Sequence, residues 1–156
     1  MTSATAAHRS QIDVRAPRFG AAIMSLLLAV EIVLALIGAT AAALILLAAI
    51  VAIFALGALD SPLHPWSALF RTIRPRLAPT TETEDAAPPR FAQLVGLIIT
   101  GAGLILGLIG VGPAIPVAAA LAFIATFLNA AIGLCLGCQI HGLLVRAGVI
   151  HRTAGA

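Results

Sequence analysis

Long apolar segments alternate with short polar ones along this chain of 156 residues. Four of the apolar segments approach the roughly 20 residues that an α-helix needs to cross about 30 Å of hydrocarbon. They cover residues 19–38, 41–59, 91–110 and 115–136. The connections inside the first pair and inside the second pair are so short that each pair must form a helical hairpin. The pattern therefore predicts an all-α, polytopic membrane protein with four transmembrane helices.

Composition supports this fold class. Hydrophobic residues make up 61% of the chain and charged residues 10%, whereas soluble globular domains carry about 25% charged residues. The net charge is +3, and all nine basic residues are arginine. These arginines flank the apolar segments and do not cluster with aromatic residues on a polar face. We therefore expect anionic lipid headgroups, and not nucleic acid, to supply the counter-charge.

The distribution of arginine predicts the orientation in the membrane. Arginines precede the first apolar segment, separate the second from the third and follow the fourth, whereas neither hairpin turn carries a charge. By the positive-inside rule, both termini and the central segment are expected in the cytoplasm, with the helices in the cell (plasma) membrane. The predicted divisions are a cytoplasmic N-terminal tail (1–15), a first transmembrane hairpin (16–59), a cytoplasmic interfacial segment with an acidic, Pro-rich linker (60–90), a second transmembrane hairpin (91–138) and a cytoplasmic C-terminal segment (139–156).

The central segment contains a predicted interfacial helix. Residues 65–74 place four apolar side chains on one side and arginines toward water, as in a short amphipathic helix that lies on a membrane. We expect His64 to lie at the surface and the carboxylates of residues 82–85 to be solvated. The residues expected at the lipid interface are Arg18, Trp66, Arg71, Arg74 and Arg90.

The chain also contains an internal repeat. Residues 16–38 and 88–110 align without gaps at an offset of 72, and both contain Pro-Arg-Phe near the start and Leu-Ile-Gly at the end. Proline starts a helix, arginine binds headgroups and phenylalanine lies at the interface. We therefore expect two tandem, parallel hairpins related by an axis near the membrane normal.

Four segments carry a resemblance to a known family: D-V-R-A-P-R-F-G (13–20), S-P…L-F-R-T-I-R-P-R-L (61–77), E-D-A-A-P-P-R-F-A-Q (84–93) and F-L-N-A-A-I-G-L-C-L-G-C (127–138). Together they resemble an uncharacterised four-helix integral membrane family of actinobacteria, a domain-of-unknown-function family with a C-terminal F-L-N-A-x-x-G-x-C-x-G-C motif. The resemblance implies no established activity, but its members are associated with thioredoxin-like and sulfurtransferase proteins, which implies thiol or sulfur chemistry. The family usually places an acidic residue and an aromatic after the second cysteine, where this chain has Gln139, Ile140 and His141.

The only two cysteines, Cys135 and Cys138, form a C-x-x-C pair where the last apolar segment gives way to polar residues. This spacing lets two sulfurs reach disulfide distance, and it lowers a thiol pKa in thioredoxin-like sites. The C-terminal end of a helix disfavours a thiolate, whereas a new helix that runs through residues 139–146 would favour one. We expect a thiol–disulfide or sulfur relay to a soluble partner, in which one cysteine attacks, the other resolves and His141 accepts a proton.

Two other interpretations of the cysteines stay open. Cys135, Cys138 and His141 have the residue types and spacing of soft metal ligands, with His151, His64 or a second subunit completing the set. Alternatively, both cysteines are small apolar fillers in a Gly-rich helix crossing. The sequence identifies no cofactor and does not decide whether the protein is an enzyme.

Two polar residues lie inside the predicted transmembrane helices. Glu31 should be neutral, paired or in a water-filled cavity, because a bare carboxylate is costly in hydrocarbon; Thr40 and Thr100 are candidate partners. Asn129 is expected to join neighbouring helices. The alternative function is a small homo-oligomeric transporter or channel that uses Glu31. Small residues provide close-packing faces for a homodimer or for the monomer itself, namely Gly101, Gly103, Gly107, Ala130, Gly133 and Gly137.

Overall fold

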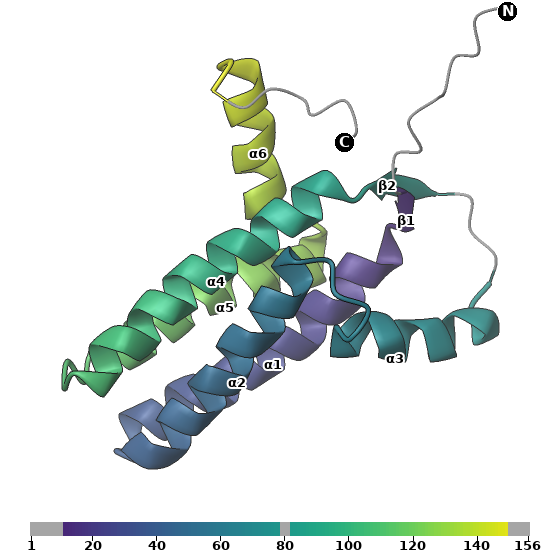
Figure 1. Ribbon diagram of the computed structural model, residues 1–156. Coiled ribbons are helices and arrows are strands. Elements are labelled where there is room, and N and C mark those ends of the chain that lie inside the picture. Colours follow the sequence, from purple (N-terminus) through teal and green to yellow (C-terminus); the bar gives the residue numbers. More distant parts are fainter. Residues whose placement is uncertain (1–10, 79–81, 150–156) are drawn as a thin grey trace, which may run out of the picture.

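The computed structural model of the chain describes residues 11–78 and 82–149, and its regular structure is helical apart from two short strands (Figure 1). Four of the helices, α1, α2, α4 and α5, are long and apolar enough to cross a membrane. The predicted all-α, multi-pass fold class is therefore confirmed. In chain order the elements are β1 (Gln11–Asp13), α1 (Arg15–Leu36), α2 (Thr40–Ala58), α3 (Pro65–Ile73), a 3₁₀ turn η1 (Arg74–Arg76), β2 (Thr83–Asp85), α4 (Ala87–Leu108), α5 (Ala114–Ile132) and α6 (Leu136–Arg146).

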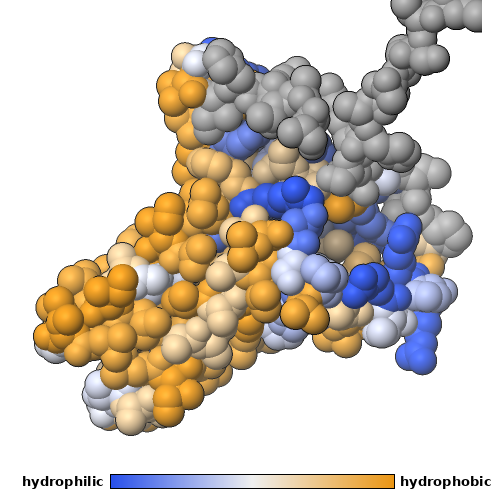
Figure 2. Space-filling view, viewed as in Figure 1, coloured by the Kyte–Doolittle hydropathy of each residue, from blue (hydrophilic) through white to orange (hydrophobic). Residues whose placement is uncertain are grey.

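The four long helices form one bundle whose two ends differ in chemistry. The turns that join α1 to α2 and α4 to α5 lie at one end, while β1, β2, α3 and α6 lie at the other, which we call the polar end (Figure 1). Figure 2 shows apolar residues covering the side of the bundle and hydrophilic residues gathered at the polar end. Side chains such as Leu26, Ile45 and Ile98 are more than half exposed. So extensive an apolar surface indicates a lipid bilayer environment.

Capping sets the start of the first helix of each hairpin. The Asp13 carboxylate accepts a hydrogen bond from the Arg15 N–H at 3.0 Å, and the Asp85 carboxylate accepts one from the Ala87 N–H at 3.1 Å. Each carboxylate satisfies one of the backbone donors that a helix start leaves unpaired. As a result, α1 and α4 begin about one turn before the apolar segments predicted at 19 and 91.

The internal repeat is present in three dimensions. The order strand, long helix, long helix, short helix occurs twice, as β1–α1–α2–α3 and as β2–α4–α5–α6. The first long helices both have 22 residues and the second long helices both have 19. Because β1, α1, β2 and α4 keep the offset of 72, the repeat extends beyond the two hairpins that the sequence predicted.

The two strands, one at the start of each repeat, pair with each other. β1 and β2 form an antiparallel ladder in which Ile12 faces Glu84, while Gln11 and Asp13 face Asp85 and Thr83. Since Glu84 is the repeat equivalent of Ile12, a pseudo-two-fold axis passes between these two residues. Of the carboxylates in residues 82–85, which were expected to be solvated, those of Glu82 and Asp85 belong to exposed residues, whereas Glu84 is half-buried in the paired strand.

Helices of different hairpins make the largest contacts in the bundle. α1 packs most extensively on α5. The equivalent pair in the other order is α4, the counterpart of α1, which packs most extensively on α2, the counterpart of α5, as the pseudo-two-fold axis requires. The larger core cluster joins side chains of three long helices, and the smaller joins side chains of α2 and α5. These clusters consist of Met24, Leu28, Ile50, Phe54, Ala119 and Ala122, and of Ala43, Leu47 and Ile115.

Glycines let the helices approach closely within one chain. A Cβ atom on Gly96 would overlap the ring of Phe54, and one on Gly103 would overlap the Ala118 side chain. Gly101, by contrast, faces open space. The predicted small-residue face at Gly103 is therefore used inside the monomer, and the homodimer stays a prediction.

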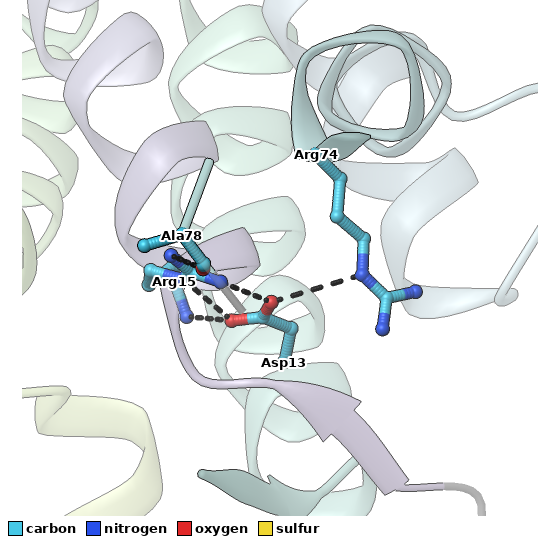
Figure 3. Close-up of polar contacts among 4 residues, drawn as sticks. All are labelled: Asp13, Arg15, Arg74 and Ala78. Carbon is cyan, nitrogen blue, oxygen red and sulfur yellow. Dashed lines mark hydrogen bonds and ion pairs between the residues drawn. The ribbon is translucent and has the colours of Figure 1, made fainter. Parts of the chain in front are cut away.

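A network of polar contacts holds β1 against η1 at the polar end. Asp13 accepts hydrogen bonds from Arg15 Nε and Nη2 at 3.2 and 3.1 Å, and it lies 3.9 Å from Arg74 Nε (Figure 3). Arg15 Nη1 donates to the carbonyl of Ala78 at 3.1 Å. The hydrogen bonds from Arg15 hold the pKa of the Asp13 carboxyl below its ordinary value.

The amphipathic helix α3 packs on α1 through its apolar side. Trp66 packs against Gly20, where a Cβ atom would lie 3.6 Å from the Trp66 side chain, and the ring centroids of Phe70 and Phe19 lie 5.8 Å apart. The expectation that His64 lies at the surface is wrong, because its side chain caps α3 and is only 7% exposed. This burial lowers the pKa of His64.

Candidate functional site

The cysteine pair lies at a helix start and not at a helix end. α5 ends at Ile132, before the predicted boundary at 136, because Gly133 adopts a left-handed φ of 71°. The chain then turns, and Cys135 becomes the N-cap of α6. Its sulfur accepts a hydrogen bond from the Cys138 N–H at 3.3 Å. The sequence left open whether a new helix follows α5 and favours a thiolate at the cysteines. The structure contains that helix, α6.

The two cysteines are joined as a disulfide. Their Cα atoms lie 5.1 Å apart, within the usual range for a disulfide. Both side chains are half-buried. The bond therefore lies in the first turn of α6, with its sulfurs beside the positive end of the helix dipole.

A cavity of about 300 Å³ borders this disulfide. Its wall comes from both repeats, because the starts of α1 and α4, together with β2, meet the α5–α6 junction there. Asn129 and Gln139 contribute amides, while Arg18, Glu82 and Glu84 contribute charges. The complete lining is Val14, Pro17, Arg18, Glu82, Glu84, Pro89, Asn129, Gly133, Cys135, Cys138 and Gln139.

Arg18 and Glu84 define the electrostatics of the cavity. A Cβ atom on Gly133 would overlap the Arg18 guanidinium, so this arginine lies directly against the end of α5. Burial raises the pKa of the Glu84 carboxyl, and the charge of Arg18 partly opposes that shift. The cavity therefore combines a positive group near the α5–α6 junction with carboxylates on the β2 side.

The structure brings some of the predicted residues together and separates others. Asn129, expected only to join helices, lines the cavity with Cys135 and Cys138. His141 follows Cys138 by about one turn of α6, but its ring contacts Phe91, with centroids 5.5 Å apart, and it is not part of the cavity lining.

The metal-binding alternative receives no geometric support. Within residues 11–78 and 82–149, no group of three His, Cys, Asp or Glu side chains is arranged to hold a metal ion. The disulfide also removes the thiolates that would be the ligands. His151, considered as a further ligand, lies outside the described residues.

Glu31 lies away from the cavity, inside the bundle. Its side chain is 0% exposed, and neither carboxyl oxygen has a hydrogen-bond partner among the described residues. The candidate partners bond elsewhere: the Thr100 hydroxyl donates to the Gly96 carbonyl at 2.7 Å, and the Thr40 hydroxyl donates to the Gly38 carbonyl at 3.4 Å.

The residues expected at the lipid interface occupy different environments. Arg71 is exposed on α3, and Arg74 pairs with Asp13 as described above. Arg90 forms an ion pair with Asp60, just beyond the end of α2. Trp66 is half-buried against α1, and its indole N–H has no partner among the described residues, so it packs in the protein.

The start of α3 repeats the geometry of the cysteine site. His64 Nδ1 accepts a hydrogen bond from the Ser67 N–H at 3.4 Å, just as the Cys135 sulfur accepts one from Cys138. His64 Nδ1 also lies 3.1 Å from Ser67 Oγ, where the other repeat has its sulfur–sulfur bond. H-P-W-S and C-L-G-C are therefore equivalent segments of the two repeats.

The following turn confirms this equivalence. Trp66 packs on Gly20, and its counterpart Gly137 packs so closely on Ala92 that a Cβ atom would overlap it. The ring contact of Phe70 with Phe19 likewise matches that of His141 with Phe91. The sequence analysis missed most of the residues that line the cavity. The internal repeat was the signal that could have found them, because a two-fold axis between the repeats brings the segments at the starts of α1 and α4 together.

No curated protein and no solved structure matches the chain. One family model matches residues 12–146, which includes every helix described above and the cysteine pair. This confirms the resemblance to an uncharacterised family, and the chain belongs to the family described as Domain of unknown function (DUF4395).

Proposed function

We propose that Cys135 and Cys138 form a membrane-held redox pair that exchanges disulfides, or passes sulfur, with a soluble partner at the polar end. The hydrogen bond from the Cys138 N–H to the Cys135 sulfur carries this proposal. A backbone donor and the positive end of a helix dipole both favour a thiolate over a thiol. In the reduced pair, Cys135 is therefore the attacking thiolate and Cys138 the resolving thiol.

The reaction balances within the pair and its partner. The Cys135 thiolate attacks a disulfide of the partner, so that the partner's sulfur–sulfur bond breaks and a mixed disulfide forms. Cys138 then loses its proton and attacks the Cys135 sulfur. The partner leaves with two thiols, and the two electrons that reduced it come from the newly oxidised pair. His141, about one turn beyond Cys138, is the proposed proton acceptor for Cys138.

Charge supports a cytoplasmic location for the polar end. Every arginine within the described residues lies in or beside β1, β2, α3, α6 or the first turns of α1 and α4, and none lies at the hairpin turns. The positive-inside rule then puts both termini and the central segment in the cytoplasm, with the bundle in the plasma membrane. A thioredoxin-like or sulfurtransferase protein is a partner of suitable chemistry on that side.

The test uses the two single cysteine variants of the full chain. Cys135→Ser and Cys138→Ser should both insert in the membrane with unchanged helix content, because serine is a good N-cap residue at 135 and is close in size to cysteine at 138. Neither should complete exchange with the oxidised, disulfide form of a thioredoxin-type protein. Cys138→Ser should accumulate a mixed disulfide on Cys135, seen as an adduct in the intact mass that reductant removes. Full exchange in both variants would reject the proposal.

A second candidate function rests on Glu31. A wholly buried carboxyl without a partner in a membrane-spanning helix is a feature of proton- or ion-translocating sites. A small homo-oligomeric transporter or channel would then lose uptake in Glu31→Gln, while substitution of the cysteines would leave uptake unchanged. The relay predicts instead that substitution of the cysteines abolishes disulfide exchange, whereas Glu31→Gln leaves exchange unchanged.

A further inference from the structure

Equivalent arginines of the two repeats end in different environments. Arg90 extends to the end of α2 and forms an ion pair with Asp60. Arg18, its equivalent at the offset of 72, extends to the end of α5 and lies against Gly133. Within the described residues, no ion pair joins Arg18 to a carboxylate. The second repeat thus has no acid just beyond α5 in the place that Asp60 takes beyond α2.

This difference leaves a cationic group in the wall of the disulfide cavity. An arginine guanidinium presents planar donors that match the two oxygens of a carboxylate. The amides of Asn129 and Gln139 lie in the same wall and supply further donors. Glu82 and Glu84 are the opposing charges, and they disfavour a ligand that carries several negative groups. The cavity therefore suits a ligand with one anionic group, held near Arg18.

The size of the cavity limits the ligand further. Its volume of about 300 Å³ is at the lower end of the range for small-molecule sites. A short thiol fits within this volume, whose lining includes both Arg18 and the two cysteines.

We propose that this cavity binds a low-molecular-weight thiol carrying a carboxylate, which reduces the disulfide between Cys135 and Cys138 while Arg18 holds its carboxylate. The proposal rests on the redox function above and identifies the source of its electrons. The thiolate of the ligand attacks one sulfur, the bond between Cys135 and Cys138 breaks, and the other cysteine leaves as a thiolate. A second ligand molecule then attacks the mixed disulfide. Two thiols are oxidised to one disulfide, and both cysteines are reduced.

The experiment compares two small thiols on the purified full-length protein in lipid nanodiscs. 3-Mercaptopropionate carries a carboxylate and 2-mercaptoethanol is its neutral counterpart. The rate of disulfide reduction is followed by alkylation and intact mass for wild type, Arg18→Gln and Arg18→Lys. Arg71→Gln is the matched control, because Arg71 is exposed on α3 and its loss removes one charge from the same end of the bundle.

The informative quantity is the ratio of the two rates, each corrected for the thiolate fraction of its thiol. Loss of one charge-assisted contact should lower this ratio about tenfold in Arg18→Gln. Arg18→Lys should recover part of the ratio, and Arg71→Gln should keep the wild-type value. If Arg18→Gln slows reduction by both thiols equally, the proposal is overturned. Arg18 would then affect the reactivity of the disulfide and not the carboxylate of the ligand.

A separate result tests the underlying redox function. If neither thiol reduces the disulfide in the native protein, although both reduce it after denaturation in detergent, the redox function fails and the ligand proposal fails with it. If both thiols reduce it at equal corrected rates in wild type and in every variant, only the ligand proposal fails.

Discussion

Ile12 lies opposite Glu84 in the two-stranded sheet, and Glu84 is also the residue that the internal repeat makes equivalent to Ile12. An antiparallel pair can join two equivalent residues only if a two-fold axis passes between them. The sheet therefore locates the axis that relates the two hairpins, and it does so at the polar end, beside the cavity. The functional consequence is that the first repeat contributes part of the wall of the cavity at the start of α6, a helix of the second repeat.

The first prediction exploits the equivalence of the two short-helix starts. Replacing His64 and Ser67 with cysteine, in a chain whose own cysteines are serine, should create a second disulfide. The reason is that the capping geometry of His64 and Ser67 already matches that of the native pair. Intact mass before and after reduction should differ by two hydrogens. Two freely alkylated thiols under oxidising conditions would contradict the equivalence.

Gly133→Ala should destabilise the protein and disturb the cavity. A left-handed backbone costs a non-glycine residue roughly 1–2 kcal/mol, and the new Cβ atom would also displace the Arg18 guanidinium. Thermal unfolding monitored by Trp66 fluorescence should shift downward, and reduction by the carboxylate thiol should slow. Gly148→Ala is the control, because its φ is 73° but nothing lies near its Cβ position. It should change stability alone; equal rates of reduction in the two variants would argue against a role for Arg18.

Acid should loosen the polar end through Asp13. Because its folded-state pKa lies below the ordinary value of 3.8, its contribution to stability is present above that pH and is lost as the pH falls through the folded pKa. Asp13→Asn keeps the cap but loses the ion pairs, which should cost about 1 kcal/mol at neutral pH. It should also flatten the pH dependence of unfolding below about pH 4.

The control for this prediction is Asp85→Asn. Asp85 caps α4 in the same way, but it forms no ion pair among the described residues. Unfolding of this variant, followed by circular dichroism from pH 3 to pH 7, should retain the acid sensitivity of the wild type. An unchanged pH profile in Asp13→Asn would show that other groups cause the loss of stability.

Removing the buried carboxyl of Glu31 should stabilise the bundle. A buried polar group without a partner costs about 1–3 kcal/mol, and leucine is apolar and of similar size. Glu31→Leu should therefore unfold at a higher temperature than wild type, whereas Glu31→Gln, which stays polar, should not. Both variants should reduce and reform the disulfide normally. A lower unfolding temperature for Glu31→Leu would indicate that the carboxyl has a stabilising partner in the membrane.

Hydropathy and charge were sufficient to predict the four long helices, because a lipid environment requires a continuous apolar segment for each crossing. The internal repeat was also visible in the sequence, since Pro-Arg-Phe occurs near the start of both α1 and α4. Strands of three residues leave no such pattern. β1 and β2 were missed for that reason, and with them the half-buried position of Glu84.

The sequence by itself determined the membrane fold class, the tandem hairpins and the closeness of Cys135 to Cys138, because each depends on residues near one another in the chain. Only the tertiary structure decided that Cys135 caps a new helix, since that depends on the left-handed turn at Gly133. The meeting of Arg18 with the cysteines was likewise beyond the sequence. More than a hundred residues separate them, and only the packing of α1 on α5 about the pseudo-two-fold axis brings them to one cavity.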